Sequence, residues 1–155
     1  MKIINFLLVA TIILFAAAVG VSEEVKRTVT VTKTSGEVMV KNPGPGSWAP
    51  AKEGDILKEG AFIKTGAGAK AALNVDGTGQ TATVDLSEKS LVSFATLVKD
   101  NVTGMKKTLL DLSVGQVLIK AEKLDTPDSK FEVKTPTSVV GVRGTKFSVK
   151  VEAVK

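Results

Sequence analysis

The sequence predicts an all-β domain, and three observations predict it. Short runs of alternating apolar and polar residues follow one another, and such alternation is typical of half-buried strands. Turn-forming residues separate these runs at short, fairly even spacing. Beyond the N-terminus, no window shows an apolar stripe of helical period over ten or more residues. Many short strands of this kind build a sandwich, a barrel or a solenoid.

Residues 1–20 have the pattern of an export signal and predict an N-terminal signal helix. Lys2 precedes an apolar run over residues 6–19, which is the order of regions in a signal peptide. The small residues Ala16, Ala18 and Gly20 fit cleavage after Ala18 or after Gly20. An uncleaved anchor is the alternative, since the whole apolar stretch is just long enough to span a membrane. We therefore expect a periplasmic or secreted protein, or one anchored in the inner membrane and facing the periplasm.

The strands that we expect are marked by apolar residues two positions apart. These residues are Val29 with Val31, Val38 with Val40, Ala71 with Leu73 and Val75, Ala82 with Val84 and Leu86, Leu110 with Leu112, Val117 with Ile119, Phe131 with Val133, and Phe147 with Val149 and Val151. Residues 42–46 contain two prolines, which lack an amide donor, and predict a loop. After the signal segment we expect a short lead-in over residues 21–27 and a single β domain over residues 28–155, because no change in composition divides the latter.

The composition excludes several kinds of chemistry. The chain has no His, Cys or Tyr, so it cannot build a Ser-His-Asp or Cys-His site, a zinc site of His or Cys, a disulfide or a lipid-modified Cys. No group of the remaining titratable residues meets the usual criteria for a catalytic site. We therefore expect no enzymatic activity, no metal and no cofactor. The net charge is +5, but the lysines alternate with acidic residues and form no basic run, so we expect no nucleic-acid partner.

Two residues are candidates for binding. Trp48 is the only tryptophan and follows the proline-rich loop; it is either an exposed binding residue or a loop residue that folds back over the core. Arg143 lies between Gly141 and Gly144; it either bonds nearby carbonyl groups or holds a carboxylate of a partner.

Four groups of residues occur in an order that is typical of a known family. They are residues 36–40; residues 48–51, 54–57 and 60–65; residues 71–77 with Leu86 and residues 90–91; and residues 112–117, 131–136 and 142–147, which include Thr135-Pro136 and Arg143-Gly144-Thr145. With these groups, residues 28–151 resemble the FecR-domain family of bacterial envelope proteins. The resemblance implies a solenoid-like stack of short strands in the periplasm. In the best-known members, an outer-membrane receptor contacts this domain, and a cytoplasmic segment controls a sigma factor.

The chain departs from that arrangement, because we expect no cytoplasmic segment and no receptor-contacting domain after Lys155. We therefore expect an exported protein-binding module that takes part in envelope signalling, with another envelope protein as its partner. The alternative is a scaffold or a module that binds an envelope polymer, either peptidoglycan or a polysaccharide. Contact with the membrane is expected only if the signal segment stays uncleaved.

Overall fold

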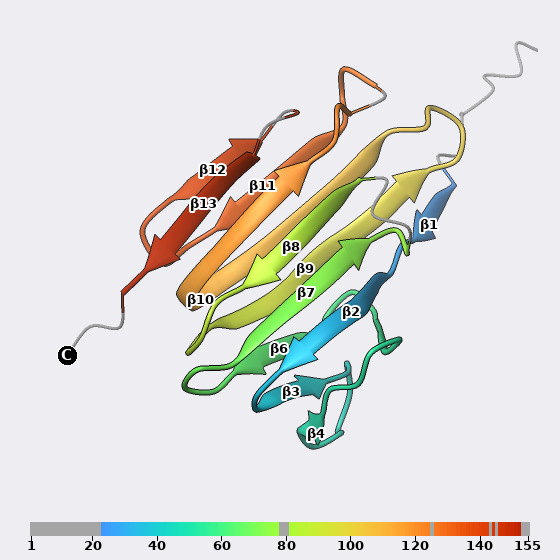
Figure 1. Ribbon diagram of the computed structural model, residues 1–155. Coiled ribbons are helices and arrows are strands. Elements are labelled where there is room, and N and C mark those ends of the chain that lie inside the picture. Colours follow the sequence, from blue (N-terminus) through green and yellow to red (C-terminus); the bar gives the residue numbers. More distant parts are fainter. Residues whose placement is uncertain (1–22, 78–80, 125, 143, 145, 153–155) are drawn as a thin grey trace, which may run out of the picture.

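The chain forms an open, curled β-sheet of thirteen strands in a computed structural model, which describes residues 23–77, 81–124, 126–142, 144 and 146–152 (Figure 1). No helix occurs among these residues, so the all-β prediction is confirmed. The predicted signal helix lies outside the described residues. In chain order the strands are β1 (Glu24–Lys26), β2 (Val29–Ser35), β3 (Val38–Lys41), β4 (Ala49–Pro50), β5 (Ile56–Leu57), β6 (Phe62–Thr65), β7 (Lys70–Val75), β8 (Ala82–Leu86), β9 (Leu91–Asp100), β10 (Lys106–Ala121), β11 (Lys130–Lys134), β12 (Val139–Val142) and β13 (Lys146–Val151).

Strand β10 joins two layers of this sheet because it is long and bent. Its residues 106–114 pair with β9 in the rear layer of Figure 1, and its residues 115–121 pair with β8 and β13 in the front layer. The rear layer has the order β4-β3-β6-β9-β10-β11-β12, with β1 beside the end of β9, and the front layer has the order β5-β2-β7-β8-β10-β13. The alternating apolar side chains of both layers point inward and meet in one core cluster, in which Phe94 and Phe131 are the largest fully buried side chains.

The bend in β10 requires a glycine. Gly115 has a φ of 100°, which side chains of L-residues rarely allow. A Cβ at this position would lie 2.2 Å from Ser90 Oγ. Because Gly115 has none, the Gln116 amide donates to the buried Ser90 Oγ at 3.0 Å, and β10 passes directly over Ser90 as it turns from one layer into the other.

The curled sheet is a half-barrel with one closed side and one open side. On the closed side, the segment after β4 bonds to both layers: the Ala51 amide donates to Val38 O of β3, and the Gly54 amide donates to Val31 O of β2. On the open side, β12 ends the rear layer and β13 ends the front layer (Figure 1). No described residue pairs these two strands with each other.

The predicted solenoid-like stack is wrong, although its short strands are present. In a β-solenoid, strands of successive coils stack in parallel, whereas here only the pair β10–β11 is parallel among the described strand pairs. The reason is the tightness of the connections. Short connections such as residues 135–138, which join β11 to β12, return the chain directly beside the preceding strand and make the two strands antiparallel.

A buried arginine ties the two layers together where the chain crosses from β1 to β2. The Arg27 side chain donates to both carboxylate oxygens of Asp76, at 2.7 and 2.8 Å, and to Thr108 Oγ1 of β10 at 2.8 Å. Thr81 also donates to Asp76 Oδ2, and the Lys106 ammonium lies 3.8 Å away. Burial by itself raises the pKa of Asp76, but the hydrogen bonds and positive charges around this carboxylate outweigh burial and hold its pKa below the ordinary value.

Candidate functional site

Trp48 lies on the outer face of the rear layer. Its ring meets the edge of the Phe62 ring with 6.4 Å between centroids, and Lys64 Nζ lies 4.5 Å from its centroid. Phe62 and Lys64 are alternate residues of β6 that point away from the core, so Trp48 covers the outside of the sheet rather than the core. The tryptophan is half-buried, and a cation already occupies one face of its ring. At least one face of the ring is therefore not open to a ligand.

Arg143, the second candidate, lies outside the described residues, and the structure places neither of its predicted roles. Its neighbour Val142 ends β12 with a buried side chain.

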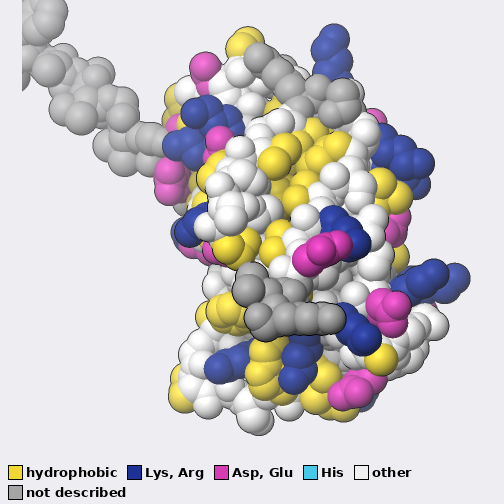
Figure 2. Space-filling view, turned by 90° about the vertical axis from the view of Figure 1, so that its left-hand side faces the viewer, with side chains coloured by type: hydrophobic (Ala, Val, Ile, Leu, Met, Phe, Trp, Pro, Cys, Tyr) yellow, Lys and Arg dark blue, Asp and Glu magenta, His cyan; other side chains and the backbone are white. Residues whose placement is uncertain are grey.

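The open side of the half-barrel presents two strand edges beside exposed apolar surface. Strand β12 pairs only with β11, and β13 pairs only with β10, within the part of the chain that the structure describes. The inward side chains at this edge are packed against the core but only half-buried; they are Val140, Phe147, Val149 and Val151. Figure 2 looks onto this side of the molecule and shows hydrophobic side chains gathered in its upper half.

Lysines alternate with those apolar residues along β13. Lys146 and Lys150 are exposed and point to the outer face of the front layer. Lys150 Nζ lies 2.8 Å from Glu152 Oε1, and this hydrogen bond and charge lower the pKa of Glu152. Charged residues on an edge strand disfavour pairing with an identical edge, because like charges would be brought together.

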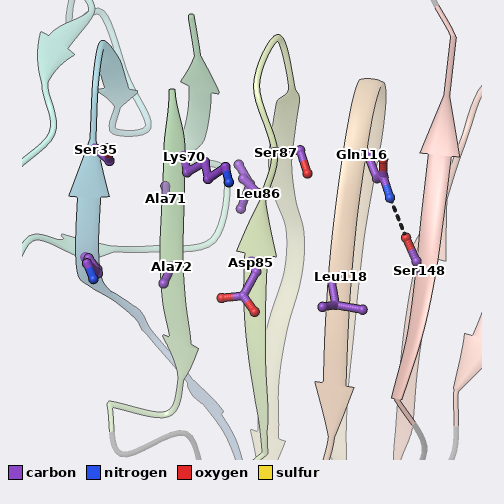
Figure 3. Close-up of a pocket in the computed structure, with 11 residues that line it drawn as sticks. Ser35, Lys70, Ala71, Ala72, Asp85, Leu86, Ser87, Gln116, Leu118 and Ser148 are labelled. Carbon is purple, nitrogen blue, oxygen red and sulfur yellow. Dashed lines mark hydrogen bonds between the residues drawn. The ribbon is translucent and has the colours of Figure 1, made fainter. Parts of the chain in front are cut away.

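A cavity of about 610 Å³ crosses the outer face of the front layer from β2 to β13 (Figure 3). Its floor is a row of residues that strand register places side by side. In order across the layer, this row contains Lys33, Ala72, Asp85, Leu118 and Ser148. The small side chain of Ala72 leaves the floor open between its longer neighbours.

Two parallel rows of residues border this floor. One contains Ser35, Lys70, Ser87, Gln116 and Lys150. The other contains Thr30, Asn74, Thr83, Lys120 and Lys146. Gln116 Nε2 donates to Ser148 Oγ at 3.0 Å, which fixes the amide against the floor at the β13 end (dashed in Figure 3). We call the floor and its two borders the lysine groove.

The lysine groove is strongly basic. Its three rows carry five lysines and a single acid, Asp85, which is a surplus of four positive charges on a chain whose net charge is +5. Of the five lysines, only Lys150 forms an ion pair with a described carboxylate. Lysines that are dispersed in the sequence are therefore brought together on one face of the fold, with Glu88 and Glu152 beside the border that contains Lys70 and Lys150.

Sequence reasoning missed the lysine groove for a physical reason. Its lysines are far apart in the chain, and only strand pairing brings them together. One signal was present: Lys70, Lys120, Lys146 and Lys150 are all at the polar positions of alternating runs, so each points away from the core.

The part of the chain that the structure describes contains neither a metal-binding cluster nor a membrane-spanning helix. Its residues contain no group of three or more His, Cys, Asp or Glu side chains that could hold a metal ion. Among the same residues, no helix is long and apolar enough to cross a membrane.

Comparison with known proteins places the chain in a family. A family model described as FecR protein matches residues 61–155, which is more than half of the chain and includes β6 to β13. No curated protein matches the chain significantly, and neither does any solved structure. The matched segment contains both strands of the open side and most of the lysine groove, whereas β2, with Lys33, lies before it.

Proposed function

This chain belongs to the FecR protein family, and we propose that it acts as an exported, non-enzymatic module that binds another protein in the periplasm. FecR proteins are known as regulators of envelope signalling. The observation that carries the proposal is the open side of the half-barrel, where β12 and β13 each leave one backbone edge without a neighbouring strand among the described residues.

An extended segment of the partner would pair with the free edge of β13. The backbone groups on this edge can form ladder hydrogen bonds with an added strand, which is a common way for a sheet to bind a peptide. The same strand would cover Phe147, Val149 and Val151, whose side chains are still half-exposed. Removing this apolar surface from water adds affinity in proportion to the area that is covered. Lys146 and Lys150 would favour acidic residues on the outward face of the partner strand.

The N-terminal pattern supports export. Residues 1–20 carry the basic start, the apolar run and the small residues of a signal peptide. Fractionation of cells that produce the full chain tests this step. We expect the protein in the periplasm or bound to the inner membrane, and the mass of its N-terminal peptide reports whether the segment has been removed. Protein found only in the cytoplasm would contradict export.

One substitution at the open edge and one away from it test the binding step, provided that circular dichroism shows both variants to be folded. Val149→Lys places an inward-pointing charge on the open edge, which discourages strand addition. Val102→Lys makes the same chemical change in a loop between β9 and β10, where Val102 is 73% exposed. We expect the tagged chain to retain specific envelope proteins, the Val102→Lys variant to retain the same ones, and the Val149→Lys variant to lose them. Equal retention by both variants would rule out the open edge as the binding site.

The alternative, binding of an envelope polymer, does not gain support from Trp48. The ring of Trp48 is engaged by Phe62 and Lys64, as described above. A different surface supports a polymer ligand, and it lies on the face of the sheet rather than on its edge.

A further inference from the structure

We propose that the lysine groove is a second binding site, and that its ligand is an anionic polysaccharide lying across the strands of the front layer. This site lies on the outer face of five strands rather than on the backbone edge that would bind a protein partner, although Lys146 and Lys150 of β13 border both surfaces. Those strands are β2, β7, β8, β10 and β13 (Figure 3).

The dimensions of the groove suit a linear chain. Neighbouring strands are about 4.8 Å apart, so the five strands span about 19 Å. Along each strand, the border rows are two residues from the floor, or about 7 Å on either side. A polymer that follows the floor therefore has lysines on both sides, with Lys70 and Lys150 on one border and Lys120 and Lys146 on the other.

The charges of the groove require acid groups on the ligand. Lys33, Lys70, Lys120 and Lys146 form no ion pair with a described carboxylate, so their ammonium groups are available to a ligand. Lysines that face the same groove repel one another weakly, and a bound polyanion relieves that repulsion.

Asp85 favours a polysaccharide over other polyanions. Its carboxylate lies in the middle of the floor and accepts hydrogen bonds, which sugar hydroxyl groups can donate. Ser87 and Gln116 on the border add groups that donate to and accept from hydroxyls. A polyanion without hydrogen-bond donors would instead meet only repulsion at Asp85.

Two other ligand classes fit less well. A peptide gains much of its affinity from backbone hydrogen bonds, but β7, β8 and the front half of β10 are paired on both sides and offer none. Single-stranded nucleic acids bind by stacking bases on aromatic side chains, and no aromatic residue lines the cavity. The same lack of an aromatic platform argues against a neutral polysaccharide.

Binding of the purified full-length chain to polygalacturonate, a uronic acid polymer, tests the proposal. We expect binding at low salt that weakens as the ionic strength rises, since exposed charges are screened. Replacing Lys70, Lys120 and Lys146 together by Gln should weaken it about tenfold or more, from the summed loss of three exposed charge pairs. Dextran, which is neutral, should not bind.

The matched control removes the same charge elsewhere. Lys52, Lys107 and Lys130 are exposed lysines outside the groove, and their combined replacement by Gln should leave binding almost unchanged. Far-ultraviolet circular dichroism verifies that both triple variants are folded. An equal loss of affinity in both variants would show that only the overall charge matters and would overturn the proposal, as would a lack of binding by the wild-type chain.

Asp85→Asn distinguishes a sugar ligand from any other polyanion. Asparagine removes the negative charge of Asp85 and with it the repulsion of any polyanion, but it also gives up the stronger acceptor for sugar hydroxyls. If Asp85 accepts hydrogen bonds from those hydroxyls, the substitution strengthens binding of polyacrylate, which has no hydrogen-bond donors, more than binding of polygalacturonate. If Asp85→Asn strengthens binding of both polymers equally, the ligand class is wrong. Because this test uses no protein partner, its result is independent of the open edge.

Discussion

Replacing Arg27 by methionine should remove the main polar link between the two layers. Arg27 is 7% exposed, and its guanidinium binds Asp76 through two hydrogen bonds and Thr108 through a third. Methionine retains much of the apolar length of arginine but donates no hydrogen bond. The Asp76 carboxylate would then keep Thr81 and the more distant Lys106, but would lose its closest opposite charge.

The cost follows from the burial of the pair. Hydrogen bonds to charged groups contribute about 1.5–3 kcal/mol each, and breaking a buried ion pair by removing one partner costs about 3–5 kcal/mol. The Asp76 side chain is 19% exposed, so water compensates part of the loss. We therefore expect the free energy of unfolding to fall by about 3 kcal/mol. For a domain of this size, such a change lowers Tm by about 10 °C.

Urea unfolding measures this change with two independent probes. Trp48, the only tryptophan, reports by fluorescence from the outer face of the rear layer, and circular dichroism reports the whole sheet. Lys26→Met is the matched control, because Lys26 is next in the chain but pairs with Glu59 at an exposed site, with 64% of the Lys26 side chain accessible. Its loss should cost less than about 1 kcal/mol.

The pH dependence gives a second reading of the same contact. The pKa of Asp76 is lower in the folded protein than in the unfolded chain, so its contribution to stability is fully present above the unfolded value of about 3.9. That contribution is lost as the pH falls through the lowered pKa. The difference in stability between wild type and Arg27→Met should therefore be largest near neutral pH and shrink below about pH 4. A loss no larger than that of Lys26→Met, or one that does not change with pH, would refute the assigned role of Arg27.

Three further substitutions test the packing. Gly115→Ala should destabilise the fold by about 3 kcal/mol or more, because the new Cβ would collide with Ser90 and the residue has a positive φ. Gly46→Ala is the control: it has open space around its Cβ and should leave the urea midpoint unchanged. Equal midpoints for the two variants would contradict the requirement for glycine at the bend of β10. Phe131→Ala should cost about 3–5 kcal/mol in urea unfolding, since the ring is 1% exposed, and a loss below about 1 kcal/mol would place the ring outside the core. Trp48→Ala should lower the free energy of unfolding by only about 1–2 kcal/mol, followed by circular dichroism, and should leave polygalacturonate binding unchanged. Weakened binding would show that Trp48 contacts the polysaccharide.

Period-two alternation was enough to locate most strands. The pairs of valines at positions 29 and 31 and at positions 38 and 40 lie in β2 and β3 with their side chains buried, as expected. Strand β9 was not predicted, although it is ten residues long. In β9 the register against β10 shifts at Ala95, so the buried residues Phe94 and Leu97 are three positions apart rather than two. Such a bulge breaks the pattern from which a strand is recognised.

The pairing of strands could not be predicted in the same way. Alternation indicates which face of a strand is buried, but it does not indicate which strand lies beside it. The runs around Leu112 and Val117 were expected as two strands, whereas they form the two halves of β10, which bends at Gly115. The lead-in also proved to be part of the sheet, because β1 pairs with β9 and Arg27 joins the layers. Since the lysine groove depends on pairing, it could be recognised only in the folded structure.

Site-specific photo-crosslinking in living cells tests the proposed binding edge most directly. A photoreactive amino acid replaces Val149 on β13 in one strain and Val102, in the loop after β9, in another. If β13 receives a partner strand, irradiation should join the chain covalently to an envelope protein from position 149 and not from position 102. Equal yields from the two positions, or no adduct from position 149 in protein that is exported and folded, would contradict the proposed function.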